Sequence, residues 1–502
     1  MRRNQLLIAV AALFATALMA ATLHAQGVVI AGSSSAQYVE LRPLTLDSVA
    51  LAQTDSAWGS YRRTSTGVLA RCVSSQPYCT FFRSGAQRGL TAMMQDLDVT
   101  AWGFGQGLSF HTQLRGRTAA GAGELWPQAT QRFDAIALYI EAVRSFGRAR
   151  LGRQWITSPL GVYNFDGAAL SSSAVHGFTA EVYGGGSLVE GLNRPLEAGA
   201  LSPVEDLPPT DRGYLIGGTI QFRPSAAGAL RAQYQREIRA DRAALYSERF
   251  AASGEFQAGT ATLSGQLSHD LATGAYNELS ASVRMPIARI FDGTLTARHY
   301  VPYFDLWTIW GAFSPVAFNE YGGDLRWAAA RGLVTLGANG AWRSYDDTHT
   351  GLATLPLRSD GWRVGASATL RPTSAIMLDG RYHVDVGFGA SGSDGDVALR
   401  WMPSERLSFA LHGMAFQTID EFQVGEGRVF GAGAESGVQI TPTVRAVGDL
   451  FMYRHDAHDQ PQMVDWNQRR ASIRLEWSIG SEPGWGWGGL IGKARDGGGG
   501  AP

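Results

Sequence analysis

Residues 470–479 read Arg-Ala-Ser-Ile-Arg-Leu-Glu-Trp-Ser-Ile, and polar and apolar side chains alternate along the whole stretch. Because successive side chains of a β-strand point to opposite faces, one face of this segment meets an oily environment and the other meets water. The same alternation recurs in residues 108–117 and 378–385. A soluble sandwich and a membrane barrel both alternate in this way, so the pattern predicts strands without choosing between the two folds.

The N-terminus distinguishes these folds. Arg2 and Arg3 precede the apolar run 6–20, and the small residue Ala25 lies at the expected cleavage site. This arrangement predicts a secretory signal peptide, residues 1–25. A retained membrane anchor is the alternative, but the run is shorter than the roughly 20 residues that a helical span needs. No later segment approaches about 18 uninterrupted apolar residues, so a mature chain that crosses a membrane must do so as a closed barrel.

Composition supports an all-β chain outside the cytoplasm. The formal net charge is −1, and loss of Arg2 and Arg3 with the signal peptide makes it −3, which argues against a nucleic-acid partner. Charged residues make up 17% of the chain, below the roughly 25% of soluble domains. We therefore expect a large antiparallel up-and-down transmembrane β-barrel. No nucleotide-loop, nucleophile-elbow or zinc-protease motif occurs, so no enzyme activity, cofactor or metal is expected.

Proline residues mark the expected hairpins. Pro224, Pro286, Pro372, Pro403 and Pro442 each lie between two alternating segments, where a residue without an N–H group ends a strand. These short turns alternate with longer loops, as the periplasmic turns and extracellular loops of outer-membrane barrels do. The pattern predicts 21 strands. Because a chain with both ends in the periplasm needs an even number, the expected range is about 18–22, with one strand missed near the cysteines or counted in excess.

The segments outside this pattern of strands, short turns and longer loops complete the expected organisation. Residues 26–90 are predicted to form an N-terminal periplasmic segment, 91–480 the barrel, and the Gly-rich residues 481–502 a disordered tail. The only cysteines, Cys72 and Cys79, are expected to form a structural disulfide. Residues 301–320 are too apolar for an exposed loop, and we expect them to fold inward as a constriction carrying Trp307, Trp310 and Phe313.

Phasing each strand by its apolar face predicts the lining of the lumen. The basic residues sent inward are Arg115, Arg117, Arg150, Arg231, Arg239, Arg371, Arg381, Arg400 and Arg474. The acidic residues include Asp96, Asp98, Asp379 and Asp385. Opposed charges either orient dipolar solutes, or they only pair with one another and keep the lumen hydrated. The sequence leaves both interpretations open. Phasing also puts Arg153 and Arg236 on the oily face, which suggests bulges or a register slip there.

Two short motifs carry a resemblance to a known family. Ala149-Arg-Leu-Gly-Arg-Gln154 is similar to a strand of Gram-negative outer-membrane porins and alginate-export-type barrels, and Phe165-Asp166-Gly167 fits the same group. The resemblance implies a water-filled channel for passive diffusion of small hydrophilic solutes, with outer-membrane lipid and the barrel-assembly machinery as partners. The alternatives are a secreted or membrane-anchored β-rich binding or structural protein, and a hydrolase embedded in a barrel.

Overall fold

The computed structural model is all-β. It describes residues 27–480 with gaps at 43, 59–60, 66–68, 74–75, 106, 122–132, 189–212, 240–244, 302–316, 330–331, 347–358, 388–389, 422–426 and 458–465. The predicted signal peptide and the Gly-rich tail lie outside the described residues. Within the described ranges, no helix has the length and apolar character needed to cross a membrane.

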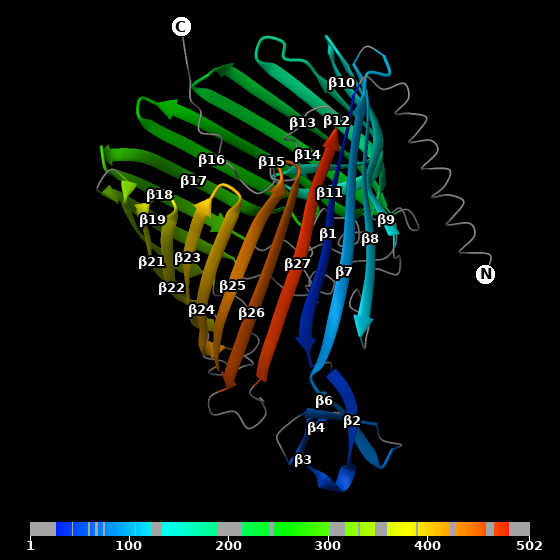
Figure 1. Cartoon of the computed structure of the whole chain (residues 1–502), viewed down its shortest axis with the longest axis vertical. Coiled ribbons are helices and arrows are strands. Elements are labelled where there is room, and N and C mark those ends of the chain that lie inside the picture. The colour runs from blue at the N-terminus through cyan, green and yellow to red at the C-terminus, as the bar shows by residue number, and fades with distance from the viewer. Residues whose placement is uncertain are drawn as a thin grey trace, which may run out of the picture.

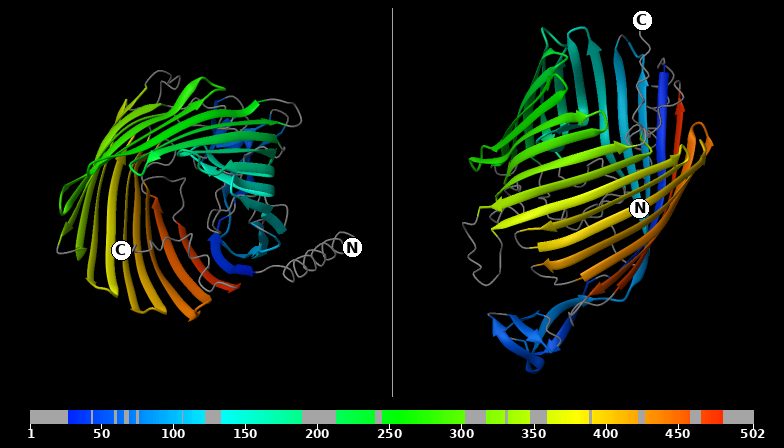
Figure 2. Two further views of the ribbon diagram at one scale, coloured as in Figure 1. Left: turned by 90° about the horizontal axis from the view of Figure 1, so that it is seen from above. Right: turned by 90° about the vertical axis from the view of Figure 1, so that its left-hand side faces the viewer.

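Twenty-two antiparallel strands form a closed barrel (Figures 1 and 2). Each strand pairs with its neighbour in the chain, and β1 closes the ring by pairing with both β27 and β7. The sheet therefore has no free edge that could pair with another chain. The strands of the wall are β1 (Gly27–Leu41), β7 (Arg88–Trp102), β8 (Leu108–Gly121), β9 (Phe133–Arg144), β10 (Gly147–Ser158), β11 (Gly161–Ser172), β12 (Phe178–Ser187), β13 (Gly213–Ser225), β14 (Gly228–Arg239), β15 (Leu245–Ala258), β16 (Ala261–Asp270), β17 (Ala275–Ala288), β18 (Phe291–Tyr300), β19 (Phe318–Ala329), β20 (Val334–Tyr345), β21 (Asp360–Thr373), β22 (Ile376–Val386), β23 (Ala390–Ser404), β24 (Leu407–Glu421), β25 (Gly427–Thr441), β26 (Val444–Ala457) and β27 (Trp466–Gly480).

A second, five-stranded sheet is inserted between β1 and β7 and lies beyond one rim of the barrel (Figure 1). Its elements are β2 (Leu44–Ala50), the 3-10 helix η1 (Leu51–Gln53), β3 (Thr54–Trp58), β4 (Tyr61–Thr64), β5 (Leu69–Cys72) and β6 (Tyr78–Ser84). Cys72 and Cys79 face each other in the β5–β6 ladder and form a disulfide, which confirms the predicted pairing.

The two ends of the barrel differ in their connections. The proline-bearing turns lie at one end, here called the short-turn end, where Val29 of β1 is also paired with Gly480 of β27. The segments 122–132, 189–212, 302–316 and 347–358 and the five-stranded sheet follow strands that run to the other end, here called the long-loop end. Short turns and barrel termini face the periplasm in outer-membrane barrels, so we expect the long-loop end to be the extracellular one.

The structure corrects the predicted domain boundaries. Residues 27–41, expected in a periplasmic segment, form barrel strand β1, which is the strand missing from the count of 21. The disulfide-bearing sheet follows β1 at the long-loop end, opposite the barrel termini, and in the expected orientation this is not the periplasmic side. β1 escaped detection because Gly32, Ser34 and Ala36 occupy its outward positions, where the alternation rule expects large apolar side chains.

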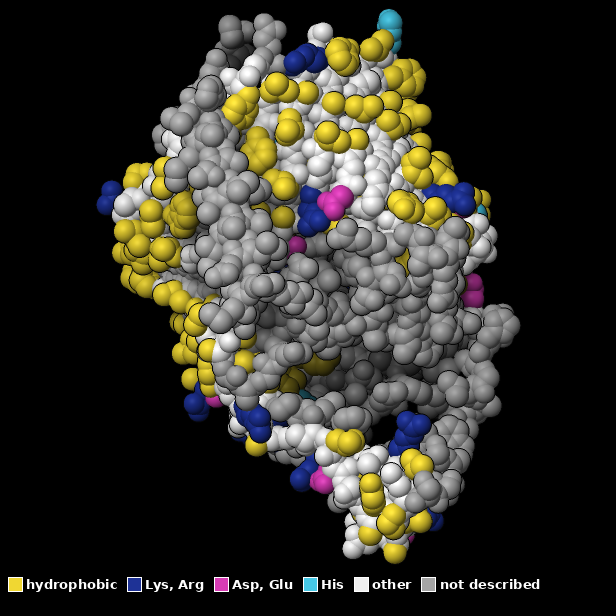
Figure 3. Space-filling view, turned by 90° about the vertical axis from the view of Figure 1, so that its right-hand side faces the viewer, with side chains coloured by type: hydrophobic (Ala, Val, Ile, Leu, Met, Phe, Trp, Pro, Cys, Tyr) yellow, Lys and Arg dark blue, Asp and Glu magenta, His cyan; other side chains and the backbone are white. Residues whose placement is uncertain are grey.

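Elsewhere the outer face of the wall is mostly apolar. Ile473, Leu295 and Ile216 are 62%, 66% and 61% exposed and occupy outward positions on three different strands. Outward aromatic pairs lie near both ends of the strands: Trp401 stacks on Phe409 at the short-turn end, and Tyr321 stacks on Trp342 at the long-loop end. Figure 3 shows one side of this surface, on which hydrophobic side chains are many and charged ones few. Such a belt with aromatic borders matches a bilayer.

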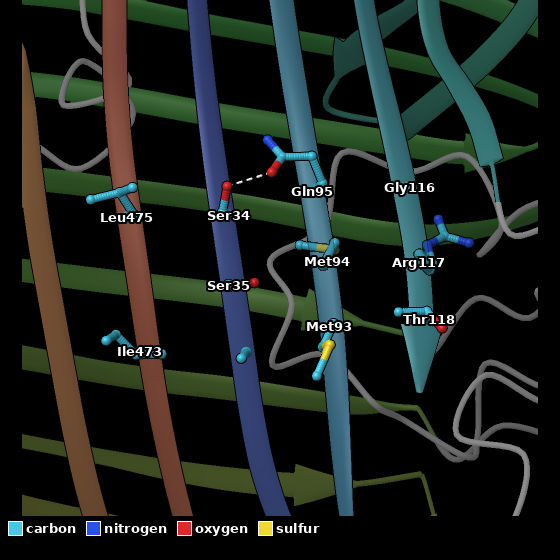
Figure 4. Close-up of a pocket in the computed structure, with 11 residues that line it drawn as sticks. Ser34, Ser35, Met93, Met94, Gln95, Gly116, Arg117, Thr118, Ile473 and Leu475 are labelled. Carbon is cyan, nitrogen blue, oxygen red and sulfur yellow. Dashed lines mark hydrogen bonds between the residues drawn. The ribbon is translucent and has the colours of Figure 1, made fainter. Parts of the chain in front are cut away.

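A cavity of about 500 Å³ lies on this outer face where the barrel closes (Figure 4). Ile473 and Leu475 of β27 border it on one side and Met93 of β7 on the other. The small outward residues of β1 leave the space between them, and Ser34 Oγ donates a hydrogen bond to Gln95 Oε1 there. Most of its lining residues occupy outward positions, so the cavity lies on the outer side of the wall.

Candidate functional site

The inner face of the wall carries the charged side chains and is the candidate site. In an antiparallel pair, residues directly opposite each other point to the same face of the sheet. Starting from the outward residues of β27, the residue pairings therefore show which residues of each other wall strand face outward. All thirteen residues predicted to line the pore occupy inward positions by this rule. For Arg239 only the register position, opposite Gly213, is described. Their role in conduction stays a prediction.

Inward arginines and carboxylates on β7–β12 form close cross-strand pairs. Arg115 Nε and Nη2 donate to the two oxygens of Asp96 at 2.6 and 3.2 Å, and both side chains are buried. Arg150 Nη2 lies 2.8 Å from Glu181 Oε1. Asp98 lies on the same inward face of β7. In this part of the lining, the arginines and carboxylates therefore largely neutralise one another.

A second set follows the inner wall from one end to the other along β20–β23, and we call it the arginine track. Arg363 binds Asp385 at 2.8 Å near the long-loop end. Arg381 binds Asp396 half-way along the strands, and Arg400 binds Asp379 at 2.7 Å near the short-turn end. The Arg363, Arg381 and Arg400 side chains are 42%, 62% and 45% exposed, so each guanidinium keeps donors for a passing solute.

The prediction omitted two arginines of this lining, Arg343 and Arg363. Arg343 lies at the long-loop end of the track, between Glu320 at 2.5 Å and Asp385 at 3.3 Å, and its guanidinium carbon lies 5.3 Å from the Phe318 ring. The alternation of side chains along the strand could have identified Arg343 as an inward residue, because its neighbour Trp342 faces outward. Arg363 could have been found in the same way.

The inner face is not polar everywhere. Phe165, Tyr183 and Leu215, on β11, β12 and β13, are almost fully buried and belong to an apolar cluster on inward positions of β10–β15. Gln154, Gln233 and Gln235 surround it, and the Tyr183 hydroxyl donates to Gln235 Oε1 at 2.9 Å. Sequence phasing missed this cluster because it expects polar side chains at every inward position.

The two motifs behind the family resemblance are partners in the wall. Arg153 faces Asp166 across β10 and β11, and Gln154 faces Phe165. Arg153 Nε and Nη2 bind the Asp166 oxygens at 2.7 and 2.9 Å, and Nη1 donates to the Ala135 carbonyl at 3.0 Å. The β10–β11 register is continuous here, so the expected bulge is absent and Arg153 does lie on the outward face.

Arg236 also lies on the outward face, opposite Glu248 of β15. The Tyr234 hydroxyl donates to Glu248 Oε1 at 2.5 Å, and Arg236 Nη1 lies 3.9 Å from the same oxygen. The register shift between β14 and β15 comes only after Glu237, so a bulge does not explain Arg236 either. Both outward arginines therefore have acidic partners on the lipid side.

The predicted constriction residues Trp307, Trp310 and Phe313 lie outside the described residues. Among the residues that are described, no group of three or more His, Cys, Asp or Glu side chains has an arrangement that could hold a metal ion.

Comparisons with known proteins give no family for this chain. No protein-family model matches it, and no curated protein matches it. Among solved structures, the outer membrane protein OpdK of Pseudomonas aeruginosa is 9% identical, with 90% of this chain and 99% of that chain covered and a TM-score of 0.38. A BenF-like porin of Pseudomonas fluorescens is 12% identical, with 90% and 99% covered and a TM-score of 0.38.

A mutant of the ferric enterobactin receptor PfeA of Pseudomonas aeruginosa is similar over 89% of this chain and 80% of that chain, at 9% identity and a TM-score of 0.47. At these identities and TM-scores, the assignment of a function rests on the barrel's own residues.

Proposed function

We propose that this chain forms an outer-membrane channel for passive diffusion of small hydrophilic solutes and has no catalytic role. The observation that carries the proposal is the closed wall with two opposite faces. Its outer face is apolar with aromatic borders, and its inner face carries the arginine track with its carboxylates. Lipid on one side and water on the other are the surroundings in which both faces are satisfied.

The arrangement of the described strands favours a channel over a plugged receptor. Barrels of 22 strands are wide, and outer-membrane transporters of this size hold a plug in the lumen. Every described strand here belongs either to the wall or to the five-stranded sheet beyond the rim. No described element thus forms a separate plug domain.

Fractionation and solute uptake test the proposal. The protein should be recovered with outer membranes and should migrate faster on a gel before boiling than after it. Liposomes that contain it should swell in small sugars and progressively less in larger ones. Recovery as a soluble periplasmic protein would overturn the membrane assignment, whereas folded barrels that leave liposomes impermeable would overturn the channel.

The arginine track should set ion selectivity. Replacing Arg381 and Arg400 by alanine leaves Asp396 and Asp379 without their cationic partners on the inner wall. The reversal potential in a salt gradient should then shift toward cations, because carboxylates remain in the path. The matched Asp379→Asn, Asp396→Asn variant should shift it toward anions. Unchanged reversal potentials in both variants would place these residues away from the conduction path.

A further inference from the structure

The end of the β10–β11 hairpin, residues 156–163, has no ladder with a neighbouring wall strand, and we call it the hairpin tip. The ladder between β9 and β10 ends at the pair Leu138 and Arg153, and the ladder between β11 and β12 ends at Phe165 and Ser187. Beyond these pairs, β10 and β11 continue to pair only with each other. The hairpin tip can therefore leave the curve of the wall while the strands below it stay in place.

Arg249 of β15 shows where the hairpin tip lies. Its Nη2 donates a hydrogen bond to the Leu160 carbonyl at 2.6 Å and contacts the Tyr163 hydroxyl. β15 is the fourth strand from β11, and neighbouring strands lie about 4.8 Å apart, so about 19 Å of wall separates them. A backbone carbonyl that one arginine of β15 can reach does not lie in the wall at β11. Because Arg249 is an inward residue, opposite Gln235, the hairpin tip crosses the inner face of β12–β14.

The hairpin tip covers inward side chains that an open lumen would expose. One apolar cluster joins three residues of the tip to three residues of the wall: Ile156, Leu160 and Tyr163, with Tyr183, Leu215 and Ala251. Ala251 of β15 is 2% exposed, whereas the three side chains of the arginine track are 42–62% exposed. The lumen is therefore filled on the β12–β15 side and open on the side of the arginine track.

The hairpin tip is also braced internally. The Tyr163 hydroxyl donates to the Leu160 carbonyl at 2.7 Å, and the Leu160 N–H donates to Ser158 Oγ at 3.1 Å. Gly161 has a φ angle of 126°, which favours glycine at this position of the turn. The Leu160 carbonyl thus accepts one hydrogen bond from within the tip and one from Arg249, and a carbonyl oxygen has two lone pairs for this purpose.

We infer that the hairpin tip is a fixed constriction of the channel and that Arg249 is the positioning residue that holds it against the inner wall. β22, which carries Arg381, is nine strands from β13 in one direction around the ring and thirteen in the other. The hairpin tip and the arginine track therefore lie on nearly opposite sides of the lumen, and solutes pass between them. The inference deepens the proposed channel function and rests on it.

Thiol labelling of the purified full-length protein in detergent tests the position of the hairpin tip without requiring conduction. Ala251→Cys should react about tenfold or more slowly with a water-soluble maleimide than Thr296→Cys, because the tip shields it and Thr296 is exposed in the lumen. Replacing residues 156–163 by an Asn-Gly turn shortens the hairpin without removing a wall pair. In this shortened variant, Ala251→Cys should react as fast as Thr296→Cys.

Planar-bilayer recording tests the constriction. The shortened variant should conduct about twofold more current and admit larger neutral polymers, because the narrowest section limits both. Arg249→Met should raise the polymer size limit in the same direction, and Arg249→Lys, which keeps a donor, should not. The matched control is Arg231→Met, which removes the same charge from an inward position of the neighbouring strand β14 and should leave the size limit unchanged.

Each result decides one part of the inference. Fast labelling of Ala251→Cys in the full-length hairpin would overturn the position of the tip. An unchanged polymer size limit in the shortened variant would overturn the constriction, and an unchanged limit in Arg249→Met would overturn the role of Arg249. If no form of the protein conducts, the proposed channel fails, and the labelling still reports where the tip lies. Heat-dependent gel migration confirms that every variant is folded.

Discussion

Replacing Leu295 by arginine is expected to lower the free energy of unfolding in lipid by roughly 2–4 kcal/mol, the cost of an arginine at the bilayer midplane. Leu295 lies midway along β18, faces outward and is 66% exposed. It has to meet acyl chains if the outer face is embedded. Denaturant titration of the barrel folded into phosphatidylcholine vesicles, followed by tryptophan fluorescence, measures the change.

The neighbouring residue provides the control. Thr296 faces the lumen, opposite Ser282 of β17 and Gly322 of β19, and these small residues leave room for a longer side chain. Thr296→Arg should therefore change the free energy of unfolding by only a few tenths of a kcal/mol, as surface substitutions do. Equal losses in the two variants would contradict the assignment of the faces.

Removing Asp166 alone is expected to destabilise the barrel by about 3–5 kcal/mol, because it leaves a charged group without its partner in a low-dielectric setting. Arg153 faces outward in the middle of β10, and both of its bonds to Asp166 are lost in Asp166→Ala. The remaining contacts are the Ala135 carbonyl and Asp134, whose oxygen lies 3.9 Å from Arg153 Nη1. Unfolding in lipid vesicles measures this loss.

The double variant Arg153→Leu, Asp166→Leu separates charge burial from the loss of an attraction. Replacing both partners of a buried ion pair by apolar residues is often close to neutral. The double variant should therefore recover most of the stability lost in Asp166→Ala. If it is as unstable as the single variant, the two residues stabilise the wall through something other than their mutual pairing.

Much of this architecture follows from one local rule. The alternation in 470–479 predicts the strand β27 and its two faces, and the proline turns predict which end of the barrel carries short connections. The same rule selects Arg381 and Arg400 as inward residues, because each lies beside an apolar residue that faces outward. Side-chain periodicity is a property of the strand itself, so these features need no knowledge of the neighbours.

The features that escaped prediction depend on neighbours. β1 has Gly32 at an outward position because the Trp477 ring of β27 lies across it, and a Cβ atom would come within 2.4 Å of that ring. Phe165 is inward and buried because it joins apolar residues from other strands. The outward position of Arg153 is explained by Asp166, which lies opposite it on β11. Each of these pairings is a contact between strands that the order of residues along one strand does not contain.

Single-channel recording in planar lipid bilayers tests the central claim most directly. The purified protein should insert as discrete conductance steps of uniform size, with a current proportional to voltage. Neutral polymers small enough to enter the lumen should reduce the step size, and larger ones should leave it unchanged. A folded, heat-modifiable barrel that inserts repeatedly without any conductance step would contradict a water-filled channel.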